Sequence, residues 1–211
     1  QIQIDRAGDY LTFRTNESDA QGDIALFDLK AKKILSLVQS PCAEFLPEFS
    51  DDGNILYFTR DCEGKPNIFQ FDIKTKEEEQ ITLDGALLTK ILYGKHLLFY
   101  IDTQKQLYAR DLLREDTPDQ PVFFDFGFSY FQSKKIQEFY LSSHIFRFFD
   151  SQKIEGFENI GTIIITFEPD SVSDNNSFFL FPVFRSLQEK KDLKFGKPFQ
   201  LSPSVFGKQL F

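Results

Sequence analysis

Few side chains in this sequence have the types and spacing that covalent catalysis requires. The two histidines are His96 and His144, and Ser142 and Ser143 directly precede the second of them. A hydrolase of the Gly-x-Ser-x-Gly kind holds its serine on a sharp turn and takes its base from elsewhere in the chain, and that motif does not occur. Neither cysteine lies beside a histidine. The sequence therefore predicts no nucleophilic hydrolase centre.

Carboxylates are plentiful, and two of them, Glu44 and Glu48, are candidates for a catalytic pair. Turn capping or solvation at strand ends explains most of the others, including Asp9, Asp28, Asp51, Asp52, Asp72 and Asp111. Glu44 and Glu48 instead lie near a predicted inner strand that ends at Ser50, and could face a channel. Two carboxyl groups about 5 to 10 Å apart can hydrolyse a glycosidic bond. A glycoside hydrolase therefore remains one alternative.

Motifs for a metal or a cofactor are missing. The segment Asp51-Asp52-Gly53-Asn54 is too short, and wrongly patterned, for a calcium loop of the helical kind. Glycine-rich phosphate loops of the Gly-x-Gly-x-x-Gly or Walker type do not occur. We predict no metal and no cofactor.

The composition limits the classes of partner that the protein can bind. The chain has 211 residues, enough for a sizeable core, and a formal net charge of -8. A nucleic-acid partner would require clustered Lys and Arg, so the charge argues against one. No run of 18 or more apolar residues occurs, so we predict no transmembrane segment, and attachment to a membrane would need residues outside these 211.

A unit of four short strands, residues 46–82, contains Glu48 and three of these aspartates, Asp51, Asp52 and Asp72. Segments 55–60 and 67–73 alternate large apolar residues with smaller or polar ones, as strands do. Asp52-Gly53 supplies the turn before them, and a polar loop, 61–66, joins them. Because such a unit cannot bury both faces alone, we expect it to stack on copies of itself.

Copies of this unit flank it at regular spacing. Gly8, Gly53 and Gly94 mark equivalent turns, 45 and 41 residues apart. The phenylalanines Phe13, Phe58 and Phe99 repeat with the same two spacings, and Asp28, Asp72 and Asp111 end the equivalent third strands. A period of about 40 to 45 residues with four strands per unit is typical of β-propeller blades.

The central unit resembles the TolB-type repeat, the Pro-Asp variant of the WD-like propeller blade. The matching positions are Ser50, Asp52, Gly53, Phe58, Asp61, Gly64, Asp72, Ile73, Ile81 and Thr82, and Asp51 replaces the proline. The resemblance covers roughly residues 7–112. It implies a fold and says little about a ligand.

We therefore predict an all-β fold, a β-propeller of four-stranded antiparallel blades in one domain, 1–211. About five blades are recognisable, with clear blades at about 1–38, 45–82 and 87–124 and weaker ones at about 126–157 and 160–202. The weaker blades would contain strands at 126–132, 136–141, 144–149, 162–167 and 177–184. We expect the C-terminal part to be irregular.

In such a blade, the connection into the inner strand and the loop between strands two and three open on the same rim. Cys42 lies in the first of these and Cys62 in the second. The pair is therefore expected within bridging reach, as a disulfide suited to an oxidising envelope compartment, and two free thiols are the alternative.

The leading functional interpretation is a non-catalytic binding or scaffold module that recognises a protein or peptide through its loop rim or central channel. The chosen rim residues are Glu44, Arg60, Asp61, Glu63, Lys65 and Asp84. The resemblance implies a periplasmic or outer-membrane-associated location in a bacterial envelope. The alternatives are the substrate-gating propeller of a prolyl-oligopeptidase-like peptidase and a five-bladed glycoside hydrolase.

Overall fold

The structure is a computed structural model that describes residues 2–16, 21–83, 85–86, 89–92, 94, 96–112, 120–121, 135–143, 149, 152–167, 178–188 and 193–201. These residues form strands joined by turns, with no α-helix among them. The described part of the chain therefore contains no helix long and apolar enough to cross a membrane. The chain forms two compact units, Gln1–Ile91 with Tyr100–Thr103 and Leu92–Phe99 with Gln104–Phe211.

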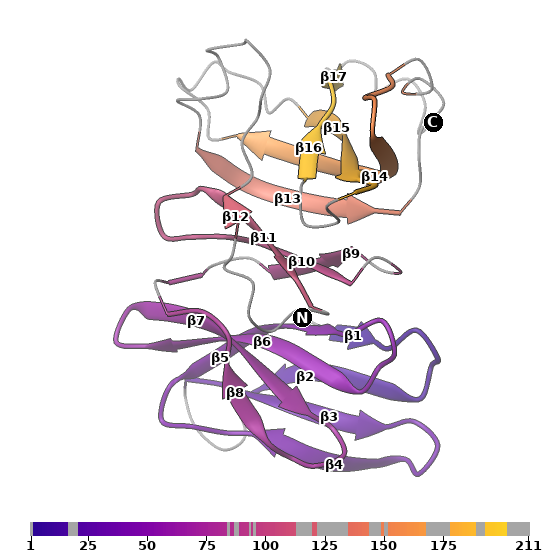
Figure 1. Ribbon diagram of the computed structural model, residues 1–211. Helices are drawn as coiled ribbons and strands as arrows, with labels where there is room; N and C mark the ends of the chain where they lie inside the picture. The colour runs from indigo at the N-terminus through magenta and orange to yellow at the C-terminus, as the bar shows by residue number, and fades with distance from the viewer. Residues whose placement is uncertain are drawn as a thin grey trace, which may run out of the picture. The chain divides into compact units, whose positions relative to one another are not determined.

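Consecutive strands pair to build four sheets (Figure 1). The first sheet contains β1 (Ile2–Ile4), β2 (Tyr10–Thr15), β3 (Asp23–Asp28) and β4 (Lys33–Val38). The second sheet contains β5 (Ala43–Phe49), β6 (Ile55–Cys62), β7 (Lys65–Asp72) and β8 (Glu78–Gln80). The third contains β9 (Thr89–Leu92), β10 (Leu97–Ile101), β11 (Leu107–Asp111) and β12 (Gln120–Pro121). The fourth contains β13 (Ile136–Ser142), β14 (Phe157–Phe167), β15 (Phe178–Ser186), β16 (Leu193–Phe195) and β17 (Phe199–Leu201).

The repeated turns have the same local structure in successive sheets. Gly8, Gly53 and Gly94 all have positive φ, at 75°, 70° and 75°, a conformation that glycine adopts without the steric penalty of a side chain. Asp28 Oδ1 accepts hydrogen bonds from the two backbone N–H groups that open the β3–β4 turn, at 2.8 and 2.7 Å. Asp72 Oδ1 caps the β7–β8 turn in the same way, at 2.7 and 2.8 Å. These acids are turn caps.

The connection between β6 and β7 is shorter than the predicted polar loop 61–66. Cys62 pairs with Lys65, so only Glu63 and Gly64 form the turn. Both have positive φ, at 58° and 79°, as in the two-residue turns whose twist matches the flanking strands. The loop is therefore a tight hairpin whose strands include most of the predicted loop residues.

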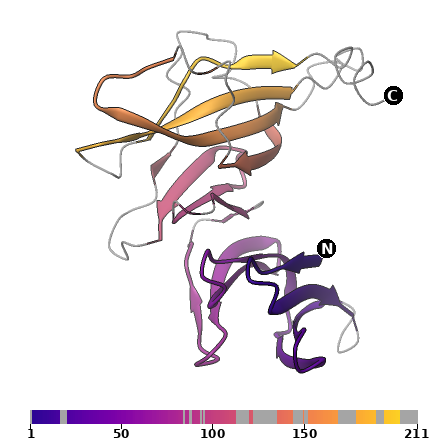
Figure 2. The ribbon, with the colours of Figure 1, turned by 90° about the vertical axis from the view of Figure 1, so that its right-hand side faces the viewer.

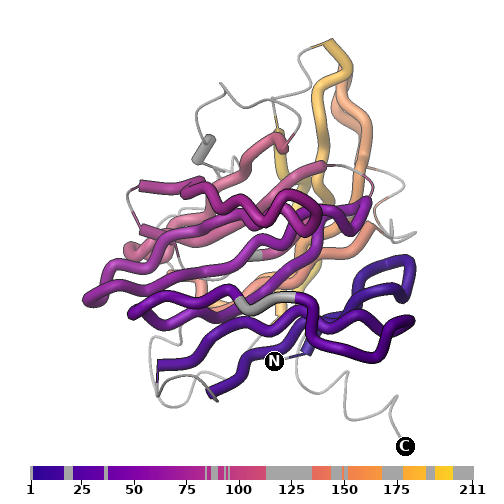
Figure 3. The backbone as a smooth tube through the Cα atoms, turned by 90° about the horizontal axis from the view of Figure 1, so that it is seen from below, coloured from indigo at the N-terminus to yellow at the C-terminus, as the bar shows by residue number. Residues whose placement is uncertain are grey.

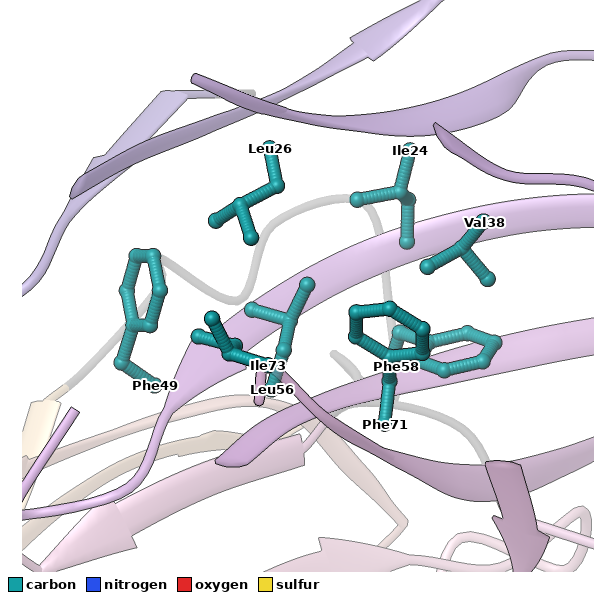
Figure 4. Close-up of a cluster of buried hydrophobic side chains, with 8 residues drawn as sticks. All are labelled: Ile24, Leu26, Val38, Phe49, Leu56, Phe58, Phe71 and Ile73. Carbon is teal, nitrogen blue, oxygen red and sulfur yellow. The ribbon is translucent and has the colours of Figure 1, made fainter. Parts of the chain in front are cut away.

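A hydrophobic core lies between the first two sheets. Ile24 and Leu26 from β3 and Val38 from β4 face Phe49, Leu56, Phe58 and Phe71 from the second sheet and Ile73 directly after β7 (Figure 4). Phe58 is fully buried and stacks on Phe69 with ring centroids 5.8 Å apart. The backbone tube passes from indigo to purple across these two sheets (Figure 3). The expected stacking of like units therefore occurs here.

The fourth sheet differs from the expected separate blades at 126–157 and 160–202. Strands from both predicted blades, β13 and β14, pair with each other, and β14 also pairs with β15 (Figure 2). Close approach of the backbones permits this pairing, since a Cβ at Gly161 would lie 2.6 Å from the Ser142 carbonyl oxygen. The predicted strand at 126–132 and nearly all of that at 144–149 lie outside the described residues.

Candidate functional site

Three connections of the first unit meet at one end of the second sheet: residues 39–44, 61–66 and 82–86, here called the rim. Cys42 and Cys62 join the first two through a disulfide. The Ala86 N–H donates to the Pro66 carbonyl at 2.7 Å, and the Gly85 N–H donates to Asn67 Oδ1 at 3.1 Å. Covalent and hydrogen bonds therefore hold the rim together.

The disulfide follows from the register of β5 on β6. Ala43 pairs with Asp61, so Cys42 and Cys62 form the next opposed pair, with Cα atoms 4.9 Å apart. That distance is within the range that a disulfide spans. Of the two alternatives that the sequence left open, the structure contains the bridge.

Replacing both cysteines should lower stability. We expect Cys42→Ser/Cys62→Ser to reduce the free energy of unfolding by about 3 kcal/mol, because the 20-residue separation closes a loop in the unfolded chain. Urea denaturation measures the loss. The wild-type protein under reducing conditions should match the double variant, and equal stability with and without reductant would contradict a bridge that constrains this chain.

Thr82 ties the third connection to β7. Its Oγ1 accepts the Ile68 N–H at 2.9 Å and donates to Asn67 Oδ1 at 3.2 Å. Thr82 occupies the Leu-Thr position of the TolB-type repeat, so this repeat position fixes where the chain leaves the second sheet. Gly85 has a φ of 90°, and a Cβ there would lie 2.9 Å from Thr103 Cγ2.

Two of the predicted rim residues form a buried ion pair. Arg60 Nε donates to Glu44 Oε1 at 2.7 Å, and Glu44 has no exposed surface. The Arg60 guanidinium lies 4.7 Å above the Phe69 ring centroid and 5.3 Å from that of Phe58. Its Nη2 also lies 2.9 Å from Glu78 Oε2, an ion pair without an aligned hydrogen bond. The prediction that Glu44 offers itself to a partner is therefore wrong: it is a buried structural residue.

Burial raises the pKa of Glu44, against the hydrogen bonds from Ser40 and Arg60 that lower it. Its Oε2 is buried without a hydrogen-bond partner. A buried carboxylate without a cation would be strongly destabilising, so the Arg60 guanidinium is needed to stabilise Glu44 and is not available to a partner.

The other predicted rim residues lie in different environments. Glu63 and Lys65 are exposed at the hairpin turn. Asp61 is half-buried, with Oδ1 buried and without a hydrogen-bond partner. Asp84 lies outside the described residues. The structure adds Leu83, which is 82% exposed between Thr82 and the Gly85–Ala86 brace. The sequence signal that could have identified Leu83 is its position: an apolar residue in the connection that directly follows the Ile81-Thr82 pair.

A second polar cluster joins the first strands of three sheets. Glu48 Oε1 on β5 accepts hydrogen bonds from Gln3 Nε2 on β1, at 3.0 Å, and from Lys90 Nζ on β9. The three positions are 45 and 42 residues apart, close to the repeat spacing. Sequence reasoning selected only Glu48, although the repeat would have identified the other two.

A β-bulge sets the direction of Glu48. Leu46 and Pro47 lie opposite Phe58 alone, because Phe45 pairs with Thr59 and Glu48 pairs with Tyr57. Leu46 has a φ of 54°, an uncommon conformation for a residue with a side chain.

The bulge also separates the two candidate acids. Glu44 pairs with Arg60 and Glu48 with Tyr57, and these two partners point to opposite faces of β6. Glu44 and Glu48 therefore do not form the facing acid pair that a glycoside hydrolase needs.

Glu48 should make stability depend on pH. Burial raises its pKa above the 4.5 that is ordinary for a glutamate, and the charge of Lys90 only partly offsets this. The folded state then binds the proton more tightly than the unfolded state, so this contribution to stability is present below 4.5 and falls as pH rises through the folded pKa. We expect wild type to gain stability relative to Glu48→Gln as pH is lowered from 7 towards 4.5. Urea denaturation at a series of pH values tests this, and a difference that stays constant would contradict it.

The second unit contains a cavity of about 630 Å³. It is lined by Phe149, Gln152, Lys153, Ile154, Glu155, Phe157, Asn159 and Phe184. The volume is in the range of small-molecule pockets. However, Gln152 Nε2 donates to the Lys197 carbonyl at 2.9 Å, and Asn159 Oδ1 accepts the Gly161 N–H at 3.1 Å. Both amides already bond the backbone, which makes this the weaker candidate. Within the described residues, no group of three or more potential metal ligands occurs.

The fold is similar to those of several solved proteins. TolB from Acinetobacter baumannii superposes with a TM-score of 0.54 at 16% identity, covering 94% of this chain and 43% of that one. A putative TolB from Agrobacterium tumefaciens gives 0.54 at 10% identity, with coverages of 93% and 64%. An auxiliary nutrient binding protein from Bacteroides thetaiotaomicron gives 0.53 at 14% identity, with coverages of 94% and 40%. The fold is that of a TolB-like β-propeller.

This agreement confirms the predicted fold class and the resemblance on which it rested. No family model and no curated protein sequence matches the chain. The chain spans 40 to 64% of the length of the three structures. At these identities the likeness concerns the fold alone, and function must be argued from the site.

Proposed function

We propose that this TolB-like propeller is a non-catalytic binding module that recognises a protein or peptide at the rim. The observation that carries the proposal is that the rim backbone is held by a disulfide and hydrogen bonds while an apolar side chain of the rim is exposed. The disulfide and the backbone hydrogen bonds of Gly85 and Ala86 fix the rim, while Leu83 is 82% exposed. A preorganised surface loses little conformational entropy on binding, which favours recognition.

The chemistry of the rim fits a polypeptide ligand. Leu83 offers an apolar anchor, and Glu63 and Lys65 offer one charge of each sign on the neighbouring hairpin. An apolar contact surrounded by polar groups is the usual anatomy of a protein interface. The partner chemistry that this surface favours is a segment with an apolar side chain flanked by charged or polar groups.

The same observations favour a non-catalytic role in an envelope compartment. Glu44 is paired with Arg60 and Glu48 with Lys90, on opposite faces of the second sheet, so neither is poised as one of a catalytic pair. A disulfide is stable in an oxidising compartment such as the periplasm. The TolB-like fold supports the same location.

Site-specific photo-cross-linking tests the proposal. A photoreactive phenylalanine analogue replaces Leu83 in one variant and Leu187, which is 61% exposed, in a control variant. Each variant is irradiated in an envelope extract. We expect a discrete adduct from position 83 that is absent from position 187. Equal labelling at both positions, or none at position 83, would contradict binding at the rim.

A further inference from the structure

The cavity of about 630 Å³ in the second unit lies between one face of the fourth sheet and the segment that leads into β14. Phe157 and Asn159 of β14 share a sheet face with Phe184 of β15, because Asn159 pairs with Phe184 and Phe157 is two residues earlier. Residues 149 and 152–155 supply the rest of the lining. The whole cavity belongs to the second unit, whereas the rim belongs to the first.

Hydrogen bonds hold the lining segment against the sheet. The Gln152 N–H donates to the Phe149 carbonyl at 2.9 Å, and the Phe157 N–H donates to the Ile154 carbonyl at 3.1 Å. The Gln152 side chain donates through Nε2 to the Lys197 carbonyl at 2.9 Å. These bonds connect the segment to β14 at one end and to the chain after β16 at the other.

Gly196 provides the space for this arrangement. A Cβ at position 196 would lie 2.6 Å from Gln152 Oε1 and 2.7 Å from Phe184 Cε2, which is closer than side-chain atoms approach one another. Glycine therefore lets Gln152 reach the Lys197 carbonyl beside the Phe184 ring. A cavity whose walls are fixed in advance loses little conformational entropy when a ligand enters.

The inner lining is apolar and largely aromatic. Phe149 and Phe184 are buried, and Ile154 and Phe157 are half-buried. Lys194 Nζ lies 4.6 Å from the centroid of the Phe157 ring. An aromatic ligand is favoured here, because rings pack on one another in offset or edge-to-face contacts.

The outer lining carries one charge of each sign. Lys153 and Glu155 are both exposed and both line the cavity. Neither forms an ion pair with any residue that the structure describes. They are two residues apart, so an anionic and a cationic group of one small ligand can reach them together.

We propose that this cavity binds a free aromatic amino acid. The ring lies on the apolar lining, the carboxylate pairs with Lys153, and the ammonium pairs with Glu155. A neutral ligand would use neither charge, and a ligand with a single charge would use one. The volume admits even the indole of tryptophan and is within the range of small-molecule pockets.

L-tryptophan is the probe that tests the proposal, because the chain itself contains no tryptophan. The full 211-residue chain is titrated into L-tryptophan, and the fluorescence anisotropy of the indole is measured. We expect anisotropy to rise and saturate with a Kd of about 0.1–1 mM, as for a ligand of this size with two partly exposed charge contacts. Tryptophanamide, which lacks the carboxylate, and indole-3-propionate, which lacks the ammonium, should bind more weakly.

Two variants with exposed side chains assign the charges and serve as controls for each other. Lys153→Met should weaken L-tryptophan and indole-3-propionate about two- to fivefold and leave tryptophanamide unchanged. Glu155→Gln should weaken L-tryptophan and tryptophanamide by a similar factor and leave indole-3-propionate unchanged. Both positions are exposed, so folding should persist, and circular dichroism checks this.

Three results would overturn the proposal. The first is the absence of saturable binding of L-tryptophan by the folded wild-type chain. The second is equal affinity for L-tryptophan and its two analogues, which would mean that the cavity recognises the ring alone. The third is binding that neither Lys153→Met nor Glu155→Gln alters, which would place the ligand elsewhere on the chain.

Discussion

Phe58→Ala should destabilise the protein by about 3–5 kcal/mol, the range for removing a large aromatic side chain from a packed core. Phe58 is fully buried where the first two sheets meet, and it stacks on Phe69 and lies beneath Arg60. Truncation to alanine leaves a cavity in the core, and residues of both sheets lose packing contacts with the ring. Urea denaturation gives the change in the free energy of unfolding.

Phe13→Ala is the matched control for this variant. Phe13 occupies the equivalent position of the preceding repeat but is only half-buried. Its replacement should cost clearly less, because less surface leaves contact. Similar losses for the two variants would contradict the placement of the core between these sheets.

Arg60→Met should cost about 3–5 kcal/mol at neutral pH, as expected when one partner of a buried ion pair is removed. Methionine retains much of the apolar stem, so the loss reports mainly the stranded Glu44 carboxylate, which has no exposed surface. Glu78→Gln removes the more exposed partner of Arg60 and should cost no more than about 1 kcal/mol.

The Arg60→Met deficit should shrink at low pH. Burial already raises the pKa of Glu44, and loss of Arg60 raises it further. Protonation in the folded state then relieves the buried charge, so the penalty is full above the folded pKa and diminishes as pH falls through it. Thermal unfolding at a series of pH values measures this. A deficit as small as that of Glu78→Gln, or one that grows on acidification, would contradict the buried pair.

The repeat predicted the parts of the fold in which local chemistry and period agree. Gly8, Gly53 and Gly94 recur at 45 and 41 residues and all adopt positive φ. Asp28 and Asp72 recur at strand ends, and both cap turns. Because these signals are local, one sequence suffices to read them.

Features that depend on register were harder to predict. The bulge at Leu46 and Pro47 inserts one residue and so separates Glu44 and Glu48 onto opposite faces, which no periodic pattern reveals. The Glu63-Gly64 turn lacks the usual Asn-Gly or Asp-Gly pair, and its polar flanks resemble a loop.

The fourth sheet shows the limit of the hydrophobic pattern. β14 and β15 are buried along most of both faces, so their sequences do not alternate and give no boundary between units. Long strands with this pattern can pair on both sides, as β14 does with β13 and β15. The rim loops were predicted from the repeat, but Leu83, which we propose as their apolar anchor, was not predicted, because the exposure of a side chain depends on tertiary contacts.

The affinity of the partner captured at the rim tests the central claim most directly. Isothermal titration should compare wild type, Leu83→Asp and Leu187→Asp, two leucines that are both more than half exposed. Loss of a central apolar anchor should weaken binding at least about tenfold for Leu83→Asp. Leu187→Asp should bind as wild type does. Equal affinities for all three proteins would contradict recognition at the rim.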